Sequence, residues 1–290
     1  MDLVGPASHS YFSQRLRLHY ADWGNAEKLP LILLHGGRDH CRNWDWVAQE
    51  LRNDWHIIAP DIRGHGDSQW SSDGNYTTMT MVTDLAQLIY QLDLSPVTIV
   101  AHSMGGNIAL RYTGLYPDTV RRLVAIEGLG PSPAMLAERD KVGQLQRVRK
   151  SIEEKRKSAG RQVKRYATFD DALKRMQAAN GHLSDEQAQH LTTHAVIRNE
   201  DGSYSWKFDP YVQHWDGIDL SQDDIHELWS SITCPTQLHY GDDSWASNPE
   251  KDGRIQYFGD NVSVKSFANA GHWLHHDQFD QFVAELRAFL

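Results

Sequence analysis

The sequence predicts an α/β protein with a mostly parallel, doubly wound sheet that a mainly helical insertion interrupts. Over the first 130 residues, short β-rich runs alternate with helical patterns, as in βαβ units. Apolar runs such as LILL (31–34) and TIVA (98–101) show little polar alternation, which is typical of parallel strands covered on both faces. After Pro131 the alternation stops, and it resumes about 100 residues later.

Seven runs are predicted to be strands, and helical patterns separate several of them. Residues 77–94 carry Met81, Leu85 and Leu88 at helical spacing, and a second helix over 107–117 ends at a proline. Residues 277–290 form a closing amphipathic helix. The predicted strands are residues 15–23, 29–37, 55–64, 97–106, 121–130, 234–243 and 261–272.

Residues 131–230 have a different pattern, rich in charge and mainly helical. A helix is predicted over 168–180, Ser184 with Gln187 has the spacing of a capping box, and Asp201–Gly202 indicates a hairpin turn. We therefore predict an α/β core of residues 1–130 and 231–290 and a helical cap of residues 131–230. The cap is inserted at the carboxyl ends of the strands, where open α/β sheets bind ligands.

Length and composition predict a soluble, unexported protein. The chain has 290 residues, of which 40% are hydrophobic, enough for one sizeable core. Its first 23 residues lack the pattern of a signal peptide, and no apolar run approaches membrane-spanning length. Because Cys41 and Cys234 have no CxxC or metal spacing, we expect no disulfide framework and a cytoplasmic location.

The net charge of −9 argues against general attraction to nucleic acid or to anionic membranes. Residues 138–165 oppose this balance, with eleven Lys/Arg against four Asp/Glu. Val142, Leu145, Val148 and Ile152 recur there at helical spacing, which predicts an amphipathic helix with a solvated basic face. A phosphate- or nucleic-acid-binding patch is the alternative, but no aromatic or glycine-rich element is interleaved with the charge.

The run VTIVAHSMGGNIAL (97–110) carries the most chemical information. A buried strand turns at once into a helix at Ser103, with Ala101 and Gly105 two residues to either side and Gly106 beyond. A turn this tight needs small neighbours, and it holds a serine exposed at a helix N-terminus. Ser103 is therefore the predicted nucleophile; the alternative is an ordinary strand-to-helix turn that Ser103 caps.

A serine hydroxyl needs a base, and His272 is the predicted one. It follows the last strand in a glycine-led loop, just before the final helix. The neighbouring His275 and His276 resemble a metal cluster, but no third ligand stands at matching spacing, so we expect no metal. His102, beside the serine, is expected to pack on the helix.

Two backbone amides are predicted to hold the oxyanion of an acyl-transfer reaction. Met104 follows the nucleophile and supplies one N–H. Gly37 ends the HGG turn after strand 29–37, where the backbone can approach a substrate closely, and supplies the other. The alternative is that HGG is a plain glycine turn.

These residues together resemble the α/β-hydrolase family of Ser-His-acid enzymes. HGG (35–37), DIRGHGDS (61–68), AHSMGG (101–106) and GHW (271–273) occur in the family's order and spacing. The insertion lies where the family carries a helical cap, so the resemblance covers nearly the whole chain and is greatest to the capped serine hydrolase-like and esterase branch. Haloalkane dehalogenases and epoxide hydrolases have an aspartate at the position of Ser103, which argues against both.

The resemblance leaves open which carboxylate is the acid that pairs with His272. In the family's common pattern it stands three residues after the glycine that ends strand 234–241, and that position is Ser244. Asp242 and Asp243 fall one and two residues after Gly241; a turn shortened by one residue would restore Asp243.

The other candidate acid is Glu127, at the carboxyl end of the neighbouring strand 121–127. Some family members carry their acid at this place, and glutamate is longer than aspartate by one methylene group. We prefer Glu127 and keep Asp243 as the alternative.

Ten tryptophans are many for this length. Trp44 and Trp46 closely follow the HGG turn, Trp245 follows Asp243, and Trp273 adjoins His272. Trp44, Trp245 and Trp273 are predicted to line an apolar substrate pocket, with core packing as the alternative for each.

The sequence thus predicts a carboxylic ester hydrolase of small to medium hydrophobic substrates, without cofactor. The same residues fit a C–C bond hydrolase of aromatic ring-cleavage products, with Arg38 or a cap arginine for a substrate carboxylate, and a ligand receptor that does not turn over. The expected partner is a small-molecule ester, without nucleic acid or membrane, and a homodimer is compatible with the sequence.

Overall fold

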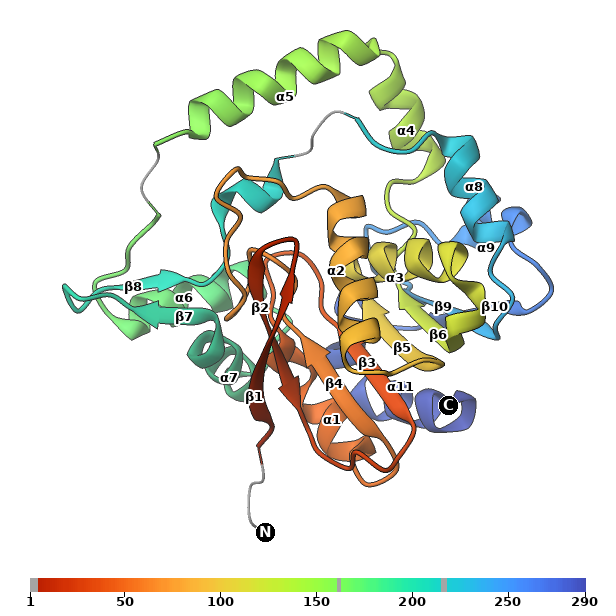
Figure 1. The fold of residues 1–290 in the computed structure, drawn as a ribbon. Coiled ribbons are helices and arrows are strands. Elements are labelled where there is room, and N and C mark those ends of the chain that lie inside the picture. Colours follow the sequence, from red (N-terminus) through yellow and green to blue (C-terminus); the bar gives the residue numbers. More distant parts are fainter. Residues whose placement is uncertain (1–4, 161–162, 215–217) are drawn as a thin grey trace.

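A computed structural model describes residues 5–160, 163–214 and 218–290. Its centre is an eight-stranded sheet in the order β1-β2-β4-β3-β5-β6-β9-β10 (Figure 1). β1 and β2 form an antiparallel hairpin that joins β4 antiparallel, and the remaining strands are parallel to one another. The strands are β1 (Ala7–Ser13), β2 (Leu16–Asp22), β3 (Pro30–Leu34), β4 (His56–Pro60), β5 (Val97–His102), β6 (Val120–Ile126), β9 (Thr236–Gly241) and β10 (Val262–Phe267).

Helices cover both faces of this sheet, as in a doubly wound fold. Buried side chains of α2 (Thr78–Gln91), α3 (Met104–Leu115) and α8 (Gln222–Ser230) share one apolar cluster with one face of the strands. Those of α1 (Asp45–Leu51) and α11 (Phe279–Phe289) share a second cluster with the other face. The predicted mostly parallel, doubly wound sheet is therefore confirmed.

The β-rich runs that the sequence predicts coincide with strands β2 to β6, β9 and β10, while β1 escaped prediction. The segment ASHSYFS exposes its first four residues and buries only Tyr11 and Ser13, so it lacks the apolar run of an inner strand. An edge strand of this kind has the composition of a loop, and it is recognised as a strand only by its antiparallel pairing with β2.

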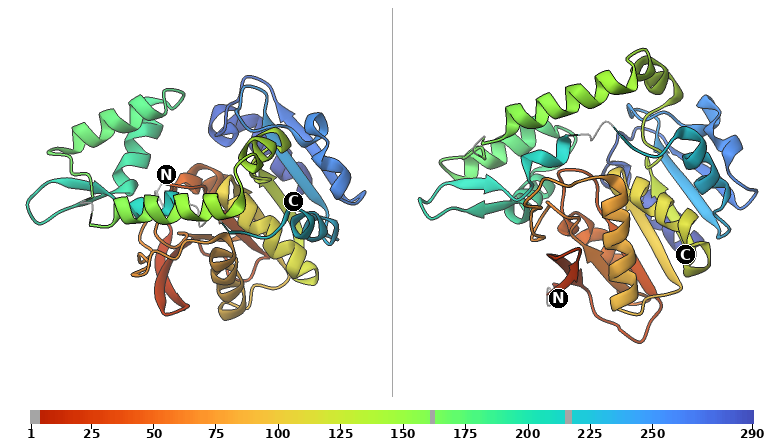
Figure 2. Two further views of the ribbon diagram at one scale, coloured as in Figure 1. Left: turned by 90° about the horizontal axis from the view of Figure 1, so that it is seen from above. Right: turned by 45° about the horizontal axis from the view of Figure 1, so that its top comes forward.

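Residues 131–230 leave the sheet after β6 and return to it before β9 (Figures 1 and 2). The capping box of Ser184 and the hairpin around Asp201–Gly202 are both present, but the amphipathic helix predicted after 138 is divided into two, with Gly143 at the second N-cap. α8 packs against α3 of the core, so the last helix of the insertion adjoins the sheet's own covering. The division into core and cap stays a prediction. The elements are α4 (Pro133–Asp140), α5 (Gln144–Ser158), α6 (Phe169–Ala179), α7 (Asp185–Ala195), β7 (Val196–Arg198), β8 (Tyr204–Trp206), η3 (Pro210–Gln213) and α8.

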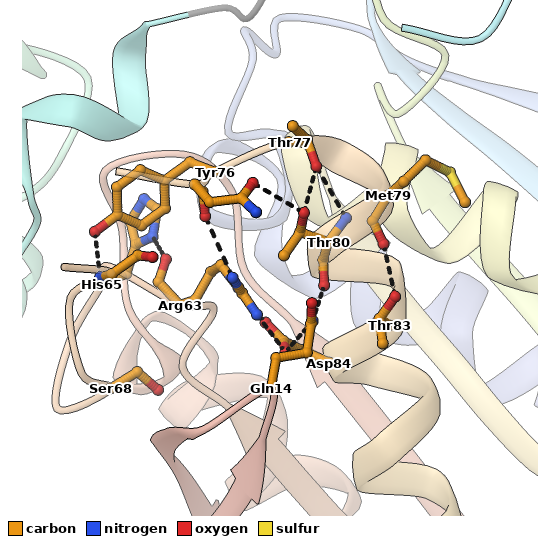
Figure 3. Close-up of polar contacts among 12 residues, drawn as sticks. Gln14, Arg63, His65, Ser68, Tyr76, Thr77, Met79, Thr80, Thr83 and Asp84 are labelled. Carbon is orange, nitrogen blue, oxygen red and sulfur yellow. Dashed lines mark hydrogen bonds and ion pairs between the residues drawn. The ribbon is translucent and has the colours of Figure 1, made fainter. Parts of the chain in front are cut away.

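The DIRGHGDS segment after β4 is held by a buried ion pair (Figure 3). Arg63 donates two hydrogen bonds to the carboxylate of Asp84 on α2, and both side chains are nearly inaccessible. Gln14, in the β1–β2 turn, donates to the same carboxylate at 3.0 Å, and Arg63 also reaches the carbonyl of Asn75 at 3.2 Å. A buried charge pair needs such additional hydrogen bonds to offset the loss of hydration. Here these bonds connect the β1–β2 turn, the segment after β4 and helix α2.

Two further observations concern the chain as a whole. Among the described residues, no helix is both long and apolar enough to cross a membrane. Cys41 and Cys234 are both free and buried.

Candidate active site

Ser103 lies at the junction of β5 and α3, where the backbone is strained. Its φ of 53° and ψ of −116° lie outside the regions that non-glycine residues favour. The amide of Ser103 donates to the carbonyl of Ile126 on β6 at 2.7 Å, which fixes the turn against the neighbouring strand. The result is a sharp strand-to-helix turn with the serine side chain half-exposed, as the pattern VTIVAHSMGG predicts.

Two glycines permit this turn by close backbone approach. A Cβ on Gly105 would lie 2.7 Å from the carbonyl oxygen of Leu34 at the end of β3, and a Cβ on Gly106 would lie 2.8 Å from the Cα of Gly128. Real Cβ atoms do not come this near to backbone atoms. The start of α3 therefore packs tightly between the ends of β3 and β6, and a larger residue at either glycine would force the backbone to shift.

His272 is within hydrogen-bond distance of Ser103. It lies in the loop after β10, and its Nε2 is 2.8 Å from Ser103 Oγ. Its Nδ1 bonds to the Glu127 carboxylate, which accepts only, so Nδ1 carries the proton and Nε2 offers a lone pair to the serine hydroxyl. This is the tautomer that a general base for Ser103 requires.

The carboxylate bonded to His272 is that of Glu127, directly after β6. Its side chain is fully buried, and its φ of 49° gives the backbone a left-handed turn at the end of the strand. One carboxylate oxygen accepts the Gly241 amide at 2.9 Å, and the other bonds His272. These hydrogen bonds fix the orientation of the carboxylate.

Asp243, the alternative acid, has a different place. The residue is exposed, and its amide donates to the carbonyl of Ala270 at 3.0 Å. Ser244, at the position where the common family pattern has its acid, donates its hydroxyl to Glu127 Oε2 at 2.7 Å. The structure thus brings together Ser103, His272 and Glu127, and GDDS supplies a supporting hydroxyl in place of an acid.

His102 supports the histidine loop. It is buried, and its Nε2 donates to the backbone carbonyl of His272 at 2.8 Å. Gly271, the preceding residue in the loop, donates its amide to Asp277 at 2.8 Å. The sequence predicted only that His102 packs on the helix; its bond to the His272 backbone had no signal in the residue pattern, because it depends on a loop 170 residues away.

The HGG turn lies directly against the serine. A Cβ on Gly36 would be 3.2 Å from the Cβ of Ser103, and one on Gly37 would be 3.8 Å from the Met104 sulfur. Met104 is the first residue of α3, so its amide belongs to the helical turn without intrahelical partners. Gly37 is exposed, which leaves its backbone open to a bound molecule.

The chain is similar to known proteins over most of its length. Residues 30–279 match the family described as the alpha/beta hydrolase fold. The chain belongs to the α/β-hydrolase family. A serine hydrolase-like protein of Danio rerio is 30% identical over 220 residues, which cover 74% of this chain and 66% of that protein. The sn-1-specific diacylglycerol lipase ABHD11 of Mus musculus is 29% identical over 279 residues (92% and 82% coverage), and the 2-hydroxy-6-oxo-2,4-heptadienoate hydrolase of Pseudomonas putida is 27% identical over 277 residues (94% and 91%).

The three tryptophans predicted to line a pocket of this α/β-hydrolase have different environments. Trp245, in the loop after β9, is 66% exposed, and its ring centroid is 4.8 Å from that of His272. Trp273 follows His272 in the loop after β10 and is half-buried. Trp44 is completely buried and stacks on His275, so its assignment to the pocket is wrong. Trp44 ends the short 3-10 helix η1 (Cys41–Trp44) and belongs to the buried apolar cluster that includes residues of α1 and α11.

Among the residues that the structure describes, two side-chain clusters have metal-ligand chemistry, and both already have internal partners. Asp45, His190 and His194 approach within 4.8 Å, but Arg42 donates to the Asp45 carboxylate at 2.8 and 2.9 Å. His19, Cys41 and Asp61 form the second group, in which His19 bonds Asp61 at 2.7 Å. His275 and His276 share the amide oxygen of Asn43, each at 2.9 Å.

A groove of about 740 Å³ lies beside the loop 66–70 and strand β8. Trp70 and Trp206 line it, but Ser103 and His272 do not. It is therefore separate from the site at the end of β5.

Proposed function

We propose that the protein is a serine hydrolase that cleaves carboxylic esters of small to medium hydrophobic substrates, without a cofactor. The observation that carries this proposal is the hydrogen-bonded chain from Ser103 through His272 to Glu127, at a strained turn between β5 and α3. Ester and lipid hydrolysis is also the chemistry named for the mouse relative.

In the proposed reaction, His272 Nε2 takes the proton of Ser103 as Oγ attacks the ester carbonyl. The amides of Gly37 and Met104 hold the oxyanion of the tetrahedral intermediate. His272 then protonates the leaving alcohol, which departs and leaves an acyl-enzyme. Water, deprotonated by the same imidazole, attacks the acyl carbonyl, and the carboxylic acid is released as Ser103 regains its proton.

Glu127 holds the imidazole in the Nδ1–H tautomer and stabilises the imidazolium that forms during both steps. Its buried carboxylate, fixed by the Gly241 amide and the Ser244 hydroxyl, is suited to this role because it cannot rotate away from His272. Trp245 lies beside the imidazole and supplies apolar surface for the acyl or alcohol group, and Trp273, next to His272 in the chain, is a second candidate for this role.

A panel of p-nitrophenyl esters of increasing acyl length tests the proposal. We expect hydrolysis by the wild type and none above background by Ser103→Ala, with the highest kcat/KM for short or medium chains. Covalent modification of Ser103 by a phosphonate reagent, detected by mass spectrometry, would identify the nucleophile. Wild-type protein that folds but hydrolyses no ester contradicts the proposal.

A C–C bond hydrolase is the second candidate, favoured by the similarity to the Pseudomonas putida enzyme over 94% of this chain. The same three residues fit that reaction. Loss of the visible absorbance of a ring-cleavage dienoate, together with inactivity on esters, would favour it. Tight binding of a ligand without turnover would instead indicate the non-catalytic receptor.

A further inference from the structure

Helix α5 is oriented opposite to an ordinary amphipathic surface helix. The apolar residues of such a helix normally face the protein and its small polar residues face water. In α5, Ser151 and Ser158 are the buried residues, whereas Leu145 is 87% exposed and Ile152 is 52% exposed. Of the apolar residues that predicted an inward face, Leu145 and Ile152 are therefore directed to the outside of the molecule, whereas Val148 is half-buried.

The outward residues form one stripe in which apolar and cationic side chains alternate. Leu145, Arg149, Ile152 and Arg156 follow one another at intervals of four, three and four residues, which places them along one line of the helix. All four are exposed, and Arg156 also pairs with Glu153 at 3.0 Å.

Two further exposed apolar residues precede α5 in the chain. Met135 on α4 is 50% exposed, and Val142 in the turn between the two helices is 37% exposed. We call Met135, Val142 and the stripe of α5 the α4–α5 surface.

The charge of α5 differs in sign from that of the chain. The helix carries six Lys/Arg against two Glu, a net charge of +4, in a protein of net charge −9. An anionic partner would therefore be attracted to this helix in particular, although the molecule as a whole repels it.

The α4–α5 surface is also placed where a broad partner can reach it. Figures 1 and 2 show α5 as a long helix at the outer border of the molecule, joined to the core through α4 on one side. On its inner side, Tyr211 of η3 donates its hydroxyl to the Lys155 carbonyl at 3.2 Å. The serine side of α5 is thus the attached side, and the stripe faces away.

Three kinds of partner are compatible with an exposed cationic helix, and the side chains distinguish them. Sites for single-stranded nucleic acid combine cations with base-stacking aromatic groups, whereas the residues between the arginines here are aliphatic and have no use in binding a polyanion. Pairing of α5 with α5 of a second copy would bring Arg149 and Arg156 against like charges. A lipid surface with anionic headgroups accommodates both classes of side chain at once.

We infer that the α4–α5 surface binds the headgroup region of an anionic phospholipid bilayer. Leu145, Ile152 and Met135 enter the boundary between headgroups and acyl chains, and Arg149 and Arg156 contact lipid phosphates. This departs from the expectation based on net charge, because a membrane interacts with the local charge of the side that meets it. The inference is independent of the proposed ester hydrolysis.

Vesicle flotation tests the inference without any need for turnover. The full chain is mixed with vesicles of phosphatidylcholine alone or of phosphatidylcholine with phosphatidylglycerol, across a series of NaCl concentrations. We expect the wild type to float with the phosphatidylglycerol vesicles only, and to be released as salt rises. The pair Leu145→Ser/Ile152→Ser and the pair Arg149→Gln/Arg156→Gln should each weaken partitioning by about tenfold or more.

Leu29→Ser is the matched control, since Leu29 is 48% exposed but precedes β3, away from α5; its flotation should equal that of the wild type. Absence of flotation with either vesicle overturns the inference, as does equal flotation of the wild type and both α5 pairs. Retention on DNA with no vesicle binding would assign the surface to nucleic acid. A dimer in light scattering that Leu145→Ser dissociates, again without vesicle binding, would assign it to a second copy.

Discussion

The hydroxyl of Ser244 donates a hydrogen bond of 2.7 Å to the Glu127 carboxylate, from the very position where the common pattern of the family has its acid. The carboxylate that bonds His272 therefore lies on a different strand end from the family's usual acid position. Glu127 reaches His272 from the end of β6, and Ser244, three residues after the end of β9, supplies a hydroxyl that orients the Glu127 carboxylate. Two predictions follow from this division of roles.

Glu127→Gln should lower kcat by about 10³- to 10⁴-fold, since the amide no longer fixes the imidazole tautomer or stabilises the imidazolium. Asp243→Asn is the matched control, because it makes the same change at an exposed carboxylate and should retain wild-type activity. Initial rates with p-nitrophenyl butyrate, on proteins whose folding is verified by circular dichroism, decide between them. If Asp243→Asn loses activity while Glu127→Gln keeps it, Asp243 after β9 is the acid and the prediction is wrong.

The acid can be moved back to the common position. In the Glu127→Gln background, Ser244→Asp puts a carboxylate where the Ser244 hydroxyl now lies, 2.7 Å from the oxygen that bonds His272. We expect it to restore at least about tenfold of the lost kcat. Ser247→Asp in the same background adds the same charge to the loop at a different place and should restore nothing. Equal rates for the two double variants would refute the relocation.

Much of the core and of the site could be predicted because the signals are local. A buried strand, a serine and two glycines in succession require a tight turn, and the structure has one at Ser103. The glycine-led loop of His272 was equally local, and the structure places its Nε2 within reach of the serine. The acid remained open between Glu127 and Asp243, because the choice depends on how two adjacent strand ends face a third loop.

What escaped prediction depends on the surroundings of a residue rather than on the residue itself. Trp44 follows the HGG turn closely, but its ring is directed into the core. The apolar positions of α5 were visible in the sequence, whereas the side of the helix that attaches to the protein was not. Spacing defines a helix face; only the packed neighbours determine where that face points.

The close approach of Gly105 to β3 predicts a large loss of stability on a small change. Gly105→Ala places a Cβ 2.7 Å from the Leu34 carbonyl, so α3 or β3 must shift. We expect the free energy of unfolding to fall by about 1–3 kcal/mol, measured by urea denaturation, and the activity to fall with it because Ser103 moves. Gly181→Ala, with no atom within 4 Å of the new Cβ, should change it by less than about 0.5 kcal/mol. Equal midpoints for the two variants would mean that the contact is relaxed at little cost.

Substitution of Asp39, two residues after Gly37, is expected to raise the free energy of unfolding by an amount that depends on pH. Burial raises the pKa of its carboxyl to about 7, whereas it is near 3.8 when solvated. As pH rises between these values, the unfolded chain ionises first, so the folded state loses stability from this group until about pH 7. One carboxyl oxygen accepts the His40 amide at 2.8 Å, and an asparagine oxygen can do the same.

Asp39→Asn should therefore match the wild type in stability near pH 4 and exceed it increasingly up to pH 7, by at most about 4 kcal/mol. The buried histidines also make stability depend on pH, but they are common to both proteins and cancel in the difference. Urea denaturation of both proteins at several pH values measures that difference. Asp243→Asn, at an exposed carboxyl, serves as the flat reference. A difference for Asp39→Asn that does not change with pH would show that the Asp39 carboxyl is already ionised in the folded protein at low pH.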